Sequence, residues 1–152
     1  MTESFAPSAG GVRMELAEWQ VTLLGKIPNM LAEARDDPSF PTSAYPDDEH
    51  ADAEFRRLMA AEWAQARSLD RAIVERTLKV AGGGVVLSMP EADAWMRVLG
   101  EARLLIAARL GIEEPGWDRD GAIEESPDLA LLHYLSWMHG GLVDVLSDLI
   151  PT

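Results

Sequence analysis

The sequence contains no cysteine, and this absence removes a large part of protein chemistry from consideration. Disulfide bonds, thiolate nucleophiles, cysteine-ligated zinc and thiol redox switches are all excluded. Positive charge is also scarce, because 13 Lys and Arg stand against 26 Asp and Glu and the formal net charge is −13. Nonspecific binding to nucleic acid depends on neutralising phosphates with basic side chains. We therefore expect weak DNA binding unless the few cations cluster.

Long apolar runs are absent as well, since none approaches the roughly 18–20 residues that a membrane span requires. The first residues, MTESFAPSAGGVR, lack the basic start and apolar core of a signal peptide. We therefore predict a cytoplasmic protein with no membrane partner. The length of 152 residues and the hydrophobic content of 47% fit one globular domain. We predict a disordered lead over residues 1–11 and a single helical domain over residues 12–150.

The clearest helical signal lies at residues 88–112, SMPEADAWMRVLGEARLLIAARLGI. Ser88 and Glu91 form an S-x-x-E capping box, which satisfies free N–H groups at a helix start. Pro90 stands just inside that start, where its missing N–H costs nothing. Gly111 follows the last apolar residues as a stop signal. This stretch therefore carries a start, a period and an end of its own, and we expect the other helices to pack on it.

Three further stretches carry helical periodicity, at residues 14–35, 49–79 and 127–149. In the first, Leu16, Trp19 and Leu23 share an apolar face, and Pro28 should kink or divide the helix. The apolar side chains of the second stretch, which we expect to face the core, are Phe55, Leu58, Met59, Trp63, Ala66, Leu69 and Ile73.

Residues 78–87 surround three consecutive glycines and fit either a short two-stranded β-hairpin or an extended linker. The predicted fold class is therefore mainly α, an irregular four-helix bundle with at most this one hairpin.

Two charged residues lie among apolar residues that we expect to be buried. Glu62 belongs to the apolar face of the helix at 49–79, and Arg103 to that of the helix at 88–112. An unpaired buried charge is costly, so each side chain needs a partner. We predict that Glu62 and Arg103 pair, directly or through Asp70, and we interpret the pair as a structural link between two helices.

Two features point to surfaces that bind a partner. The opposite side of the helix at 49–79 carries a broad arc of basic residues, which comprises Arg56, Arg57, Arg67, Arg71 and Lys79. This arc is either a solvated helix face or a docking surface for an acidic protein or for DNA phosphates. Trp137 projects from the more polar side of the last helix. It either docks another chain, including a second copy in a homodimer, or is covered within the monomer.

A metal-dependent enzyme is the least favoured reading of the sequence. His50 and Glu54 have the i, i+4 spacing of two metal ligands on a helix, with Asp47, Asp48 and Asp52 close by. The same residues are also explained by the acidic start of a helix, whose dipole favours negative charge there. No motif of a nucleotide-binding loop, zinc protease or serine hydrolase is present. We therefore predict a protein that is not an enzyme and that needs no cofactor.

Three segments of the chain resemble the three blocks of an actinobacterial family catalogued as a domain of unknown function. The segments are AEFRRLMAAEWAQAR (53–67), EADAWMRVLGEARLLIAARLGI (91–112) and LHYLSWMHGGLVDVL (132–146). That family includes the AosR-type oxidative-stress-responsive transcription regulators. The resemblance implies a regulatory domain that acts on transcription, with RNA polymerase or a sigma factor as the candidate partner.

The chain departs from AosR-type regulators in one respect, because those are associated with a redox-active cysteine pair and this sequence has no cysteine. The resemblance therefore implies a regulator whose signal comes from a partner, a ligand or methionine oxidation. The genes of the family tend to lie near those for a ClpS-type adaptor and a JAMM-type metalloprotease. This context leaves a second reading open, an adaptor in Clp-type regulated proteolysis.

Overall fold

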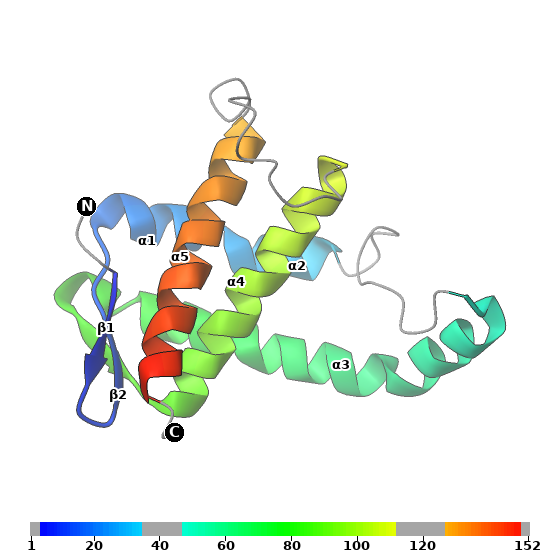
Figure 1. The fold of residues 1–152 in the computed structure, drawn as a ribbon, viewed down its shortest axis with the longest axis horizontal. Helices are drawn as coiled ribbons and strands as arrows, with labels where there is room; N and C mark the ends of the chain where they lie inside the picture. The colour runs from blue at the N-terminus through cyan, green and yellow to red at the C-terminus, as the bar shows by residue number, and fades with distance from the viewer. Residues whose placement is uncertain (1–3, 35–46, 112–126, 150–152) are drawn as a thin grey trace.

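The computed structural model describes residues 4–34, 47–111 and 127–149 (Figure 1). These ranges contain five α-helices and three short strands. The helices are α1 (Glu18–Leu24), α2 (Ile27–Glu33), α3 (Glu49–Leu78), α4 (Met89–Arg109) and α5 (Pro127–Leu149); the strands are β1 (Phe5–Ser8), β2 (Gly11–Met14) and β3 (Val85–Leu87). The prediction of a mainly helical protein is confirmed. The described helices number five because the first predicted helix is divided at Gly25 and Lys26, just before Pro28.

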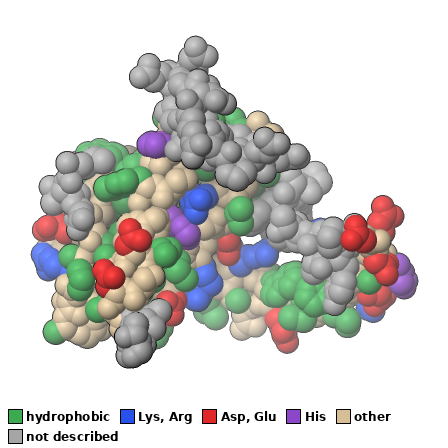
Figure 2. Space-filling view, viewed as in Figure 1, with side chains coloured by type: hydrophobic (Ala, Val, Ile, Leu, Met, Phe, Trp, Pro, Cys, Tyr) green, Lys and Arg blue, Asp and Glu red, His purple; other side chains and the backbone are tan. Residues whose placement is uncertain are grey.

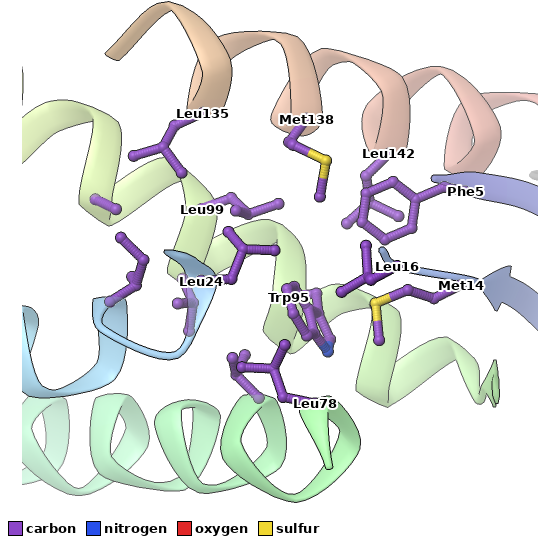
Figure 3. Packing of buried hydrophobic residues seen from close by; sticks show 14 of the residues in the cluster. Phe5, Met14, Leu16, Leu24, Leu78, Trp95, Leu99, Leu135, Met138 and Leu142 are labelled. Atoms are coloured by element: carbon purple, nitrogen blue, oxygen red, sulfur yellow. The ribbon is translucent and has the colours of Figure 1, made fainter. Parts of the chain in front are cut away.

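Helix α4 begins where its sequence signals place the start. The Ser88 hydroxyl accepts from the Glu91 N–H at 3.3 Å, and the Glu91 carboxylate accepts from the Ser88 N–H at 2.8 Å. Gly111 follows the helix at a φ of 72°, a left-handed conformation that glycine adopts without strain. Its apolar face centres on Trp95, which lies between Leu142 of α5 and Leu78 of α3 (Figure 3). Local signals therefore position the helix around which the core forms.

Helix α3 also has the predicted length, and the Asp48 carboxylate caps it by accepting from the Ala51 N–H at 3.0 Å. Its predicted inward face is wrong at Leu58 in the first half and at Leu69 in the second half. Leu58 and Leu69 are 67% and 59% exposed, whereas the fully buried side chains described on α3 are Asp70, Val74, Thr77 and Leu78. For Leu58 the reason is tertiary, because α3 extends past α4 and its first half projects beyond the helices that pack against the second half (Figure 1).

The expectation of a disordered lead is wrong for residues 5–8, which form β1 and pair with β2 in an antiparallel register from Phe5↔Met14 to Ser8↔Gly11. Phe5 is only 3% exposed, and its ring meets that of Trp95 edge to face at a centroid distance of 6.4 Å. Burial of one aromatic ring and pairing with a neighbouring strand order this segment, although its composition resembles that of a loop. Residues 1–3 lie outside the described part.

The hairpin expected within residues 78–87 is also wrong, as is the alternative of an extended linker. Residues Ala81–Gly83 form one 3₁₀ turn, and only Val85–Leu87 is a strand. That strand pairs with β2, where Val12 lies opposite Leu87, and the sheet order is β1-β2-β3. At Gly11 a side-chain Cβ would lie 1.8 Å from the Leu87 carbonyl oxygen, so only glycine permits this close approach.

A single cluster of buried side chains joins the sheet to the helices (Figure 3). Helices α4 and α5 lie side by side and antiparallel, β1 runs beside the second half of α5, and α1 and α2 pass behind this pair (Figure 1). None of the helices in the described ranges is long and apolar enough to cross a membrane.

Candidate functional site

Three aromatic rings form a row on the surface where α1 meets α5. The Tyr134 ring lies 5.4 Å from that of Trp19 and 6.1 Å from that of Trp137, measured between centroids. Trp19 is 55% exposed and Trp137 37% exposed. We call Trp19, Tyr134 and Trp137 the aromatic row. Large aromatic side chains with this much exposure are common at protein–protein interfaces.

Hydrogen bonds hold the middle of the aromatic row in place. The buried Gln20 amide donates to the Tyr134 hydroxyl at 3.0 Å and to the Ser4 hydroxyl at 3.1 Å. Burial raises the pKa of Tyr134, against a smaller lowering by the bond from Gln20, so the phenol stays neutral at physiological pH. Tyr134 is therefore fixed in the middle of the row, and a partner that binds there would restrict little further freedom of that side chain.

A groove of about 490 Å³ adjoins Trp137 and lies between β1 and the second half of α5. Pro7 and Asp144 lie on its opposite walls, and Gly140 and Gly141 also line it. A Cβ added at either glycine would meet nothing within 4 Å, so both leave open space beside the helix backbone. The groove and the aromatic row share Trp137, so they adjoin one another on the surface.

Trp137 was predicted to be a docking residue. In the structure its ring contacts that of Tyr134, and the side chain is partly exposed to solvent. Trp19 was missed because its spacing with Leu16 and Leu23 indicated the core. Leu16 is buried, but Trp19 is exposed because the first predicted helix begins only at Glu18, after a turn out of β2. No local signal in the sequence distinguishes Trp19 from a core residue.

The predicted ion pair between Glu62 and Arg103 does not form. Glu62 is exposed on the projecting half of α3. Arg103 faces α5, where it donates to the Ser136 hydroxyl at 3.1 Å and to the His139 Nδ1 at 2.9 Å. Because α4 is packed between α3 and α5, a charge on its buried surface can point to either neighbour, and the helical period does not say which.

The ion pairs that link α3 to α4 involve other residues. Arg97 donates from Nε and Nη2 to the two carboxylate oxygens of Asp70 at 2.8 and 2.9 Å. Arg67 lies 3.9 Å from Glu101, whose pKa is raised by burial against the lowering effect of that arginine. Asp70 was proposed as the intermediary between Glu62 and Arg103, but in the structure it pairs with Arg97. The arrangement is that of a structural link between helices.

A family model matches residues 1–146 of the chain, and its description is domain of unknown function (DUF2017). The chain belongs to the DUF2017 family. Searches among curated proteins and among solved structures each found no match. The resemblance to a family of unknown function is thereby confirmed at this level, whereas its AosR-type and actinobacterial detail stays a prediction.

In this member of the DUF2017 family, the arc of basic residues predicted on α3 is partly neutralised by neighbouring carboxylates. Arg56 lies 3.0 Å from Asp52, and Arg57 lies 2.7 Å from Glu54. Arg67 is turned toward Glu101, and Arg71 is half-buried nearby. On the face shown in Figure 2, most Lys and Arg side chains lie near the middle, and Asp and Glu side chains lie on either side of them. Acidic neighbours thus offset the charge of Arg56, Arg57 and Arg67.

The metal site considered for His50 and Glu54 has no structural support. Among the residues with described positions, no group of three or more His, Asp or Glu side chains is placed to hold a metal ion. The Glu54 carboxylate instead accepts from Arg57, and the Asp48 carboxylate caps α3. The acidic helix start explains these residues.

Proposed function

We propose that this DUF2017 protein is a non-enzymatic regulatory protein that acts by binding another protein through the aromatic row. The observation that carries the proposal is the exposure of two tryptophans in one ordered surface. Tryptophan and tyrosine dominate the binding energy of protein interfaces because they bury much area with few rotatable bonds. Tyr134 is held by a hydrogen bond from Gln20, and its ring contacts those of both Trp19 and Trp137.

The proposed partner belongs to the transcription apparatus, RNA polymerase or a sigma factor, as the resemblance to AosR-type regulators implies. Protein contacts are favoured over DNA contacts on physical grounds. The net charge of −13 opposes approach to phosphates, and the arginines at 56, 57 and 67 lie beside carboxylates. DNA contact through Arg56, Arg57, Arg67 and Arg71 would therefore be a weak addition. Regulation would not use cysteine oxidation.

The test is affinity capture of the native protein from an actinobacterial lysate treated with nuclease. The bait is the wild type, a Trp19→Ala/Trp137→Ala double variant, or a Leu69→Ala control, which removes an apolar side chain of similar exposure on α3. We expect RNA polymerase or a sigma factor with the wild type and the control, and at least about tenfold less with the double variant, as for loss of a binding hot spot. Circular dichroism checks that each bait is folded.

Two results would change the proposal. Equal recovery with the double variant would remove the aromatic row from the interface. Specific recovery of Clp components in place of transcription proteins would favour the adaptor role. An Arg56→Glu/Arg57→Glu variant tests the arginine arc in the same assay, and we expect little change because both side chains already pair with acidic neighbours on α3.

A further inference from the structure

Helices α4 and α5 hold a half-buried arginine, Arg103, between them. We propose that Arg103, Ser136 and His139 form a binding site for one carboxylate group, carried either by a small organic acid or by an acidic side chain of another protein. This inference goes beyond the proposed function, because none of these residues belongs to the aromatic row. It rests on the charge of Arg103, on the hydrogen-bond donors around it and on the space beside Gly100.

Arg103 lacks the acidic partner that a comparable arginine on the same helix has. Arg97 binds both carboxylate oxygens of Asp70, at 2.8 and 2.9 Å. Among the described residues, no Asp or Glu lies at ion-pair distance from Arg103, and its hydrogen bonds go to a hydroxyl and an imidazole. The imidazole is neutral, because arginine can only donate and His139 accepts through Nδ1. A partly desolvated cation with only neutral partners gains more from an added anion than one that is already paired.

The three side chains carry donors that no described residue accepts. Arg103 donates from Nε to the Ser136 hydroxyl at 3.1 Å and from Nη1 to His139 at 2.9 Å, so both N–H groups of Nη2 remain. Thr77 donates its hydroxyl to the Ile73 carbonyl, but no such bond from Ser136 to its own helix occurs in the described ranges, and its O–H also remains. A neutral His139 that accepts at Nδ1 carries its proton on Nε2. The cluster therefore offers donors and one positive charge, which is the combination that binds an oxyanion.

The donors are accessible from solvent. A Cβ added at Gly100 would lie 3.4 Å from Nε2 and 3.7 Å from Cδ2 of His139, so the glycine leaves this edge of the imidazole uncovered. Neither Arg103 Nη2 nor His139 Nε2 is a buried unpaired atom among the described side chains, so both reach water. In Figure 2, Lys and Arg side chains gather near the middle of the face, where Figure 1 shows α4 beside α5. An anion thus meets a locally positive surface on a chain of net negative charge.

The charge of the site favours a carboxylate over a phosphate. Arg103 supplies one full positive charge, and the neutral His139 adds none. A carboxylate carries a single negative charge at neutral pH, whereas a phosphate monoester carries about two. The additional charge of the phosphate would be repelled by a chain whose formal net charge is −13. The planar carboxylate also fits the planar fork of a guanidinium.

The first probe is sodium acetate, titrated into the full chain and followed through the arginine Nε–H and histidine signals of its nitrogen NMR spectra. Sodium chloride replaces acetate at constant ionic strength in a parallel titration, which removes the effect of screening. With acetate we expect saturable shifts of Arg103 and His139 and a dissociation constant of about 10 mM, as for one ion pair with charged hydrogen bonds. The spectrum of an Arg103→Gln variant identifies the arginine signal by its loss.

Variants separate this site from general charge attraction. Arg103→Gln should abolish the saturable shift of His139, whereas Arg57→Gln removes an exposed arginine charge on α3 and should leave the affinity within about twofold. Ser136→Ala keeps the guanidinium but removes one donor, so acetate should bind about fivefold more weakly. Gly100→Ala keeps every donor and covers the Nε2 edge of the imidazole, so it should also weaken binding. Circular dichroism checks the fold, and the last two variants test the site even if Arg103→Gln unfolds.

Further probes identify the carrier of the carboxylate. The peptide acetyl-Gly-Glu-Gly-amide presents the group as a side chain, and acetyl-Gly-Gln-Gly-amide is its uncharged control. Binding of the glutamate peptide at least as tightly as acetate would assign the site to an acidic protein side chain, and binding of acetate alone would assign it to a small organic acid. Inorganic phosphate should bind more weakly than acetate, and tighter binding would overturn the choice of carboxylate. Equal shifts with acetate and chloride, or unchanged acetate affinity in both Ser136→Ala and Gly100→Ala, would overturn the site itself.

Discussion

At the scale of single residues, the two partners of the Asp70–Arg97 ion pair differ in how deeply they are buried. Asp70 is 7% exposed, whereas half of the Arg97 side chain is in solvent. A buried carboxylate that loses its partner keeps its desolvation cost, but an arginine at the surface can turn its guanidinium to water. The link between α3 and α4 therefore depends more on the arginine than on the carboxylate.

We predict that Arg97→Ala lowers the free energy of unfolding by about 2 kcal/mol and Asp70→Ala by about 1 kcal/mol, the range for charged hydrogen bonds. Urea denaturation followed by tryptophan fluorescence measures both. Arg57→Ala is the control, because its exposed pair with Glu54 within α3 should contribute less than about 1 kcal/mol. An equal or reversed order for the first two variants would contradict the argument from unequal burial.

His139 should make the stability of the protein depend on pH. Burial, and then the nearby Arg103 guanidinium, hold the pKa of His139 below its ordinary value of about 6.5. Because arginine can only donate, His139 accepts through Nδ1 in its neutral form. The unfolded chain thus binds a proton at a higher pH than the folded one, so stability is full above about pH 6.5 and falls as the pH drops toward the lowered pKa.

The corresponding prediction concerns His139→Gln, which keeps an acceptor for Arg103 and cannot titrate. Between about pH 7.5 and pH 5.5, the free energy of unfolding should fall less for this variant than for the wild type. Urea denaturation at the two pH values measures the difference, and the carboxylates common to both proteins cancel. His133→Gln, on the exposed side of the same helix, serves as control. Parallel pH profiles for His139→Gln and the wild type would refute the assignment.

At the scale of secondary-structure elements, the long helices could be predicted because their signals are local. The capping box at Ser88, the acidic cap at Asp48 and the proline at position 28 each act within a few residues of the chain. The sheet could not be predicted, because its three strands have only three or four residues each and β3 pairs with β2 across more than seventy positions. Such pairings depend on the assembled core.

The same division applies to the candidate site. Trp137 could be identified from its place on the polar side of α5, a property of one helix. The aromatic row and the groove could not, since they require α1 and β1 to meet α5, which lies more than a hundred residues later in the chain. Helical periodicity locates an apolar face but not the neighbour that covers it, which is why Leu58, Leu69 and Arg103 were placed wrongly.

The two halves of helix α3 should differ in their stability against local unfolding. Its fully buried described side chains all lie at residues 70–78, and its first half carries exposed Leu58. A helical segment that packs little against a core opens with a small free energy. In hydrogen exchange followed by mass spectrometry, we predict faster exchange for peptides within residues 49–63 than for those within residues 70–78. Uniform protection along α3 would mean that a further contact holds the first half.

At the scale of the whole molecule, the two ends of the described chain close one core. Strand β1 lies beside α5 in Figure 1, and Phe5 and Leu142 meet at the Trp95 side of the cluster in Figure 3. A hydrophobic core of this size stabilises a domain only when all its layers are present. The N-terminal segment is therefore part of the folding unit, although its composition is that of a tail.

We predict that Phe5→Ala destabilises the protein by about 3–5 kcal/mol, the usual cost of removing a buried phenylalanine ring. The ring is almost fully buried and touches Trp95 on α4, so its loss leaves a cavity where the sheet meets the helices. Urea denaturation should show a lower midpoint with a similar slope, because the whole core unfolds together. Pro7→Ala, an exposed position in the same strand, should change stability by less than about 0.5 kcal/mol. If both substitutions had the same small effect, residues 5–8 would be a dispensable tail and the groove that they form with α5 would lose its first wall.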